Sequence, residues 1–148
     1  MRKDNKTLFI ILGAAFLLCC CGGFGGFALI GANAVKQVSG DATKEVEAIM
    51  IPASETWDAS AMAEAVHDPT PQRIEFVQIV FNELKPKGKI LSVEGNVNGV
   101  ASNWDNGVSK KTMTWQGTLK QENGESKATI KLIEMGGTHW RIEDIYLR

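Results

Sequence analysis

The chain has 148 residues, of which 16 are basic and 17 acidic, so its formal net charge is −1 at pH 7. Once Arg2, Lys3, Asp4 and Lys6 are set aside, 13 basic and 16 acidic residues remain, and a net charge of −3 gives no electrostatic reason to expect nucleic-acid binding. The three cysteines, at positions 19 to 21, lie in an apolar run, so the rest of the chain cannot form a disulfide framework or a cysteine-based metal site.

The first predicted element is a membrane anchor over residues 8–35. No charged residue occurs between Thr7 and Val35, and a helix of that length exceeds the hydrocarbon core of a bilayer, which is roughly 30 Å thick. Residues 1–7 carry three basic residues against one acidic residue. This bias predicts a cytoplasmic N-terminus and a single pass through the cell membrane, with the C-terminal domain on the extracytoplasmic side.

Two other fates of the leader stay open. Cleavage after Ala34 would use a site with small residues at positions 32 and 34, but the apolar run before it is longer than that of a signal peptide. Lipidation would modify a cysteine after Leu18. A lipid-modified cysteine is normally followed by a polar tether, whereas this sequence remains apolar up to Val35. The spacing of Gly22 and Gly26 suits close contact between two membrane helices, and the oligomeric state is left open.

A short linker, residues 36–41, leads into a soluble domain over residues 42–148. Apolar residues at steps of three and four predict an amphipathic helix from Asp41 to Glu55, which Pro52 is expected to kink or end. A second, short helix is predicted within residues 57–69.

The third predicted helix, residues 71–84, has the clearest signals in the chain. Thr70 is a plausible N-cap, and Pro71 takes the first helical position, where its missing N–H costs nothing. Lys85-Pro86 is expected to end the helix. Its predicted apolar stripe consists of Ile74, Phe76, Val77, Val80, Phe81 and Leu84.

Three turn signals then separate four predicted strands. The turns are expected at Asn106-Gly107, Asn123-Gly124 and Gly136-Gly137, where positive φ is tolerated. The strand-like runs cover residues 89–104, 108–122, 125–135 and 138–148. Such an order predicts an antiparallel meander with one apolar face, which the helix 71–84 is expected to cover.

The apolar face of this predicted sheet can be assigned from the alternation in each strand. It carries Leu91, Val93, Gly95 and Val97, then Met113, Trp115, Gly117 and Leu119, then Ala128, Ile130 and Leu132. In the last strand the alternation changes phase between Ile142 and Ile145, which predicts a β-bulge near Glu143-Asp144.

No set of residues points to a specific chemistry. His67 and His139 are not spaced for a zinc site, no serine lies in a nucleophile turn, and no metal or cofactor is expected. Candidates for general acid–base work are Glu94, His139 and Asp144.

The four tryptophans are many for so small a domain. Trp115 and Trp140 lie on apolar strand faces and are expected in the core, whereas Trp104 is expected to be exposed beside a turn. Trp104, His139 and Trp140 are the candidate residues for binding a ligand or a partner.

The segments "TWDASAMAEAV", "PQRIEFVQIVFNELKPKGKI" and "THWRIEDIYLR" carry a resemblance. Helices followed by a curved four-stranded antiparallel meander resemble the cystatin-like and NTF2-like α+β folds, as found in small membrane-anchored or secreted bacterial proteins of uncharacterised function. A weaker likeness is to the single-span assembly factors of cytochrome oxidase. These likenesses imply a fold and transfer no functional residues.

The leading hypothesis is a non-enzymatic, membrane-anchored extracytoplasmic domain that binds a protein partner or a small ligand in the concavity between helix and sheet. The alternatives are an NTF2-like enzyme with a cone-shaped pocket and an assembly factor for a membrane complex such as cytochrome oxidase. They differ in whether the concave face of the sheet is filled by side chains or left open.

Overall fold

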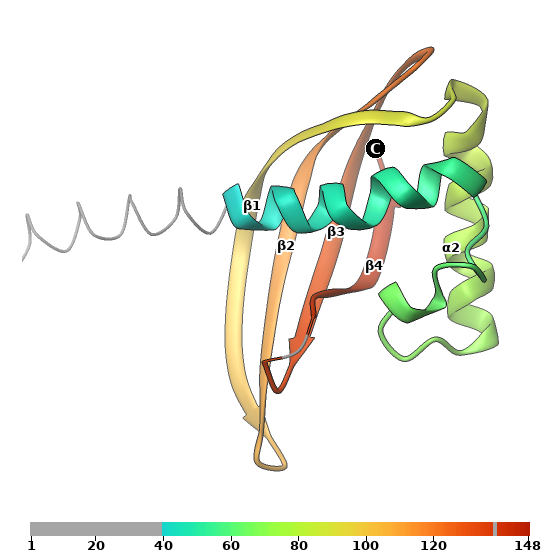
Figure 1. Ribbon diagram of the computed structural model, residues 1–148. Helices are drawn as coiled ribbons and strands as arrows, with labels where there is room; N and C mark the ends of the chain where they lie inside the picture. Colours follow the sequence, from blue (N-terminus) through green and yellow to red (C-terminus); the bar gives the residue numbers. More distant parts are fainter. Residues whose placement is uncertain (1–39, 138) are drawn as a thin grey trace, which may run out of the picture. The chain divides into compact units, whose positions relative to one another are not determined.

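The computed structural model describes residues 40–137 and 139–148 (Figure 1). They form an α+β fold in which two helices pack on a four-stranded antiparallel sheet of order β1-β2-β3-β4, compatible with a cystatin-like or NTF2-like fold. The elements are a first helix at 40–56, η1 Ala63–Ala65, α2 Pro71–Leu84, η2 Lys85–Lys87, β1 Ile90–Asp105, β2 Val108–Gln121, β3 Gly124–Met135 and β4 Arg141–Leu147.

The predicted anchor, residues 8–35, and the cytoplasmic segment before it lie outside the described residues. Among residues 40–137 and 139–148, no helix combines the length and the apolar composition needed to cross a membrane.

The first helix crosses the middle of the sheet, whereas α2, the helix expected to cover the sheet, packs on it beside the first helix. Figure 1 shows it passing across one face of the sheet, here called the inner face, while α2 lies on the side of β4. Ala42, Val46 and Met50 of the first helix are at most 1% exposed. The expected packing of α2 on the sheet is confirmed in part: its buried residues belong to the same core as the sheet, but the middle of the sheet lies under the first helix. An apolar stripe identifies a buried helix face without identifying which part of the sheet buries it.

Pro52 does not end this helix, which continues to residue 56. The side chain of Pro52 is exposed, whereas the neighbouring Ser54 is buried and its hydroxyl donates to the Ile51 carbonyl (2.7 Å) and accepts from the Ile90 N–H (3.0 Å). Packing and these bonds on the buried side hold the last turn together despite the missing N–H.

The short helix predicted within residues 57–69 is reduced to the three residues of η1. The turn before η1 is held by α2: the Gln78 side chain accepts from the Ala59 N–H (2.9 Å) and donates to the Trp57 carbonyl (3.0 Å). The Asp58 carboxylate accepts from the Ser60 N–H. Backbone groups of this segment therefore form hydrogen bonds with side chains in place of the backbone hydrogen bonds of a helix.

The helix α2 begins and ends where the sequence predicts. Thr70 has an extended backbone and its hydroxyl accepts from the Arg73 N–H (3.4 Å). Val77, Val80, Phe81 and Leu84 are buried, and Phe81 meets Trp57 edge-on with ring centroids 5.5 Å apart. Phe76, predicted to widen the stripe, is 41% exposed.

Replacing Thr70 with alanine is expected to lower the free energy of unfolding by about 1 kcal/mol, because an N–H of the first turn loses its acceptor. Thermal unfolding of the full-length chain measures this effect. Thr70→Ser keeps the hydroxyl and is expected to unfold like the parent. Equal losses for both variants would contradict the capping role.

The hairpin turns are placed almost as predicted. Asp105 pairs with Val108 across Asn106-Gly107, both of which have positive φ. The second turn is shifted by one residue, since Gln121 pairs with Gly124 and the loop is therefore Glu122-Asn123. The side chains of Gln121 and Ser126 pack inward beneath this turn and set the register.

Irregularities in the outer strands decide which residues face inward. In β1 the register shifts between Ile90 and Ser92, so Ile90 is buried and Leu91, predicted on the inner face, is 62% exposed. In β4 the predicted bulge is confirmed: Leu132 pairs with Ile142 and Lys131 with Asp144, which leaves Glu143 as the extra residue.

The centre of the core is Trp115, which is fully buried. Its ring lies over Gly95 and Gly117, which face each other on β1 and β2, and a Cβ added at Gly95 would lie 2.5 Å from the Gln116 carbonyl oxygen. The Trp115 indole N–H donates to the Thr43 hydroxyl (3.1 Å), which in turn donates to the Gly95 carbonyl (3.2 Å). The first helix is thereby joined to two strands at one point.

Candidate functional site

The end of the sheet that carries the β1–β2 turn holds the most exposed tryptophan. From Asn98 to Val108 every residue is exposed, and we call this segment the hairpin arm. Trp104 is 74% exposed and Val100 60% exposed. Figure 1 shows the β1–β2 hairpin extending beyond the first helix, which explains why the inner face is uncovered there. The predicted exposure of Trp104 is confirmed.

The register places Val100 and Trp104, two large apolar side chains of the arm, on the same face. Asn98 is the extra residue of a bulge between Val97 and Gly99, and its side chain donates to Gln116. Beyond the bulge, Val100 pairs with Met113, which is buried on the inner face. Because side chains alternate between faces, Val100 and Trp104 both lie on the continuation of the inner face.

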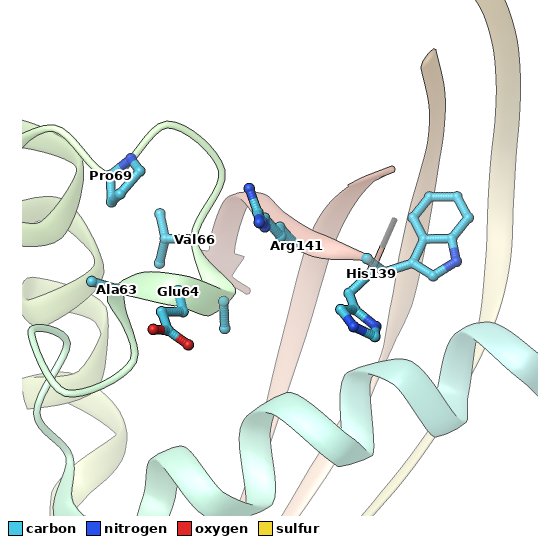
Figure 2. A pocket seen from close by; sticks show the side chains of 8 residues that line it. Ala63, Glu64, Val66, Pro69, His139 and Arg141 are labelled. Atoms are coloured by element: carbon cyan, nitrogen blue, oxygen red, sulfur yellow. The ribbon is translucent and has the colours of Figure 1, made fainter. Parts of the chain in front are cut away.

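His139 and Trp140 contribute to a pocket of about 570 Å³ between the start of β4 and η1 (Figure 2). Glu64 comes from η1, and Arg141 is the first residue of β4. Trp140, expected in the core on the last strand, lies just before β4 and is half-buried against the core. Neither Glu64 nor Arg141 stood out in the sequence, because only the fold brings η1 beside β4.

Two backbone contacts hold the walls of this pocket in place. Val66 forms a parallel bridge with Ile142, and the His67 N–H donates to the Ile142 carbonyl (2.8 Å). The Arg73 guanidinium donates to the His67 carbonyl (3.0 Å), which fixes the same segment to α2. A carboxylate, an imidazole and a guanidinium around one hollow suit a small polar ligand that carries charge.

The three acid–base candidates lie at three different places. Glu94 is on the outer face, where it accepts from Lys120 Nζ (2.6 Å) and raises the pKa of Lys120. Asp144 lines a separate pocket of about 270 Å³ beside α2, and its charge raises the pKa of Tyr146. His139 lines the pocket described above. The fold does not bring these groups to one reacting centre.

Glu143, the extra residue of the bulge in β4, forms an ion pair. Its carboxylate lies 2.9 Å from Lys131 Nζ, and this contact raises the pKa of Lys131. This ion pair joins β3 to β4 on the outer side of the sheet. It accounts for the position of the Glu143 carboxylate without a bound ligand.

The inner face next to these sites is filled. Ile130, Leu132, Ile142 and Ile145 are at most 1% exposed beneath the first helix. The concavity in which the sequence analysis placed a ligand is therefore occupied by side chains over the described residues, and the hairpin arm and the pocket at His139 are surface features outside it.

No protein-family model, no curated protein and no solved structure matches the chain.

Proposed function

We propose that the chain is a membrane-anchored domain on the extracytoplasmic side that acts by binding a protein partner, with the hairpin arm as its contact surface. The observation that carries this proposal is the 74% exposure of Trp104 at the end of a projecting hairpin. A large aromatic side chain leaves water favourably when a partner covers it, and tryptophan is enriched among the residues that dominate binding energy.

The filled inner face supports binding over catalysis. An enzyme with a cone-shaped pocket needs an open hollow lined by acid and base groups, whereas this face holds buried apolar side chains and the candidate groups lie apart.

The anchor is proposed from the uncharged run at 8–35 and the basic residues before it.

A photo-crosslinking amino acid at position 104 of the full-length chain tests the contact surface in cells. We expect a crosslinked product of higher mass from position 104. The matched control places the same amino acid at position 123, which is also exposed but lies in the turn at the opposite end of the sheet. No product at 104, or equal products at both positions, would overturn the proposed surface.

The anchor is tested separately by alkaline extraction of membranes. Full-length protein is expected to stay in the pellet and to keep its N-terminal residues in mass spectrometry. Protein that begins at Val35, or that is released by the extraction, would overturn the anchor.

A further inference from the structure

The hairpin arm also has a free strand edge. β1 is the first strand in the sheet order, so among residues 40–137 and 139–148 no strand pairs with its other edge. Residues 98–105 of β1 are all exposed and project past the first helix (Figure 1). An edge of this kind presents a row of backbone donors and acceptors that another strand can pair with.

The two-residue turn determines which backbone groups point outward. Asp105 and Val108 flank the turn, and in such hairpins the flanking residues exchange both hydrogen bonds. Because the pattern alternates, the N–H and C=O groups of Val100, Ser102 and Trp104 point away from β2. The same three residues place their side chains on the inner face.

Residues 99–104 of the arm carry neither a charged residue nor a proline, two common means of protecting a free edge. Lysine and proline are the common protective residues on edge strands. The bulge at Asn98 limits pairing on the N-terminal side but leaves the seven residues from Gly99 to Asp105 regular.

We infer that the free edge of the hairpin arm pairs antiparallel with the same edge of a second copy of this chain, with Ser102 at the two-fold axis. In this register Val100 of each copy faces Trp104 of the other. Pairs of a β-branched and an aromatic side chain are favourable across antiparallel strands. Asp105 of each copy faces Gly99 of the other, so no like charges meet.

This arrangement is self-complementary, as a two-fold interface must be. It forms about six backbone hydrogen bonds and covers both exposed tryptophans. The inference rests on the proposed function in one respect: two chains anchored in one membrane have a raised effective concentration, which a short strand pairing needs.

A cysteine at the axis tests the pairing. In a full-length background with Cys19, Cys20 and Cys21 replaced by alanine, Ser102→Cys is expected to give a disulfide-linked dimer on mild oxidation in membranes. Directly opposed residues of a hydrogen-bonded pair have Cα atoms about 5.5 Å apart, within disulfide range. Asn103→Cys, at a position that is also exposed but faces Ala101 in this register, is expected to give background levels.

A second variant distinguishes strand pairing from chance collision of two chains in the membrane. Val100→Lys combined with Trp104→Lys places like charges opposite each other across the interface, and it is expected to abolish the dimer of the Ser102→Cys chain. Both positions are exposed, so the unfolding temperature is expected to stay unchanged.

Equal dimer at positions 102 and 103, or a dimer that survives the two lysines, would overturn the pairing. Products at position 104 that contain only other proteins would overturn it while leaving the proposed function intact. A crosslinked dimer of the chain itself at position 104 would support both.

Discussion

Gly117→Ala is expected to lower the free energy of unfolding by about 3 kcal/mol and the unfolding temperature by roughly 12 °C or more. A methyl group at this position overlaps the Glu94 carbonyl oxygen and the ring of Trp115. The carbonyl belongs to the paired strand β1, and Trp115 is fully buried. Neither can move without disturbing the contact between the first helix and the sheet.

Near-UV circular dichroism of the full-length chain in detergent measures this loss, because the signal of a buried tryptophan reports its packing. Gly99→Ala is the matched control: it makes the same change in the same sheet, but a Cβ there has no neighbour within 4 Å. We expect this control to unfold like the parent. Similar losses of stability in both variants would show that Gly117 contributes backbone flexibility to the strand rather than space for the ring of Trp115.

Gln121→Leu is expected to lower the free energy of unfolding by about 2–3 kcal/mol. The Gln121 side chain is 5% exposed, and its amide nitrogen donates to the carbonyls of Leu84 and Gly88, both at 2.9 Å. Its amide oxygen accepts from the Ser126 hydroxyl (2.9 Å). Leucine fills much of the same space but leaves these groups without their partner away from water.

Chemical denaturation of the full-length chain measures this effect. Gln116→Leu is the control on the same strand: Gln116 is half-buried and its side-chain partner Asn98 is exposed, so water can replace the bond. A change below about 0.5 kcal/mol is expected for the control. If Gln121→Leu unfolds like the control, the buried network does not hold the end of α2 to the sheet.

Much of the fold could be predicted because local signals agree with the tertiary structure. Thr70 and Pro71 start α2, and Asn106-Gly107 sets the first hairpin. The phase change between Ile142 and Ile145 located a bulge before any pairing was known. In each case the neighbouring residues alone determine the backbone conformation.

The errors arose where distant residues decide the structure. The segment before α2 failed to form a helix because Gln78 holds it from another element. Leu91 faces solvent because Ile90 takes the buried position through a shift in pairing with β2. The candidate site was predicted in part for the same reason: the exposure of Trp104 follows from its own hairpin, whereas the pocket at His139 requires Glu64 from η1.

The bond between Thr43 and Trp115 joins residues 72 positions apart in the chain, and Ile145 of β4 belongs to the same core. Contacts so distant in sequence close late in folding. A ribosome must therefore release the chain through β4 before the core can assemble. We expect products that end before β4 to remain open to proteases, so that cells keep only copies in which all four strands are present.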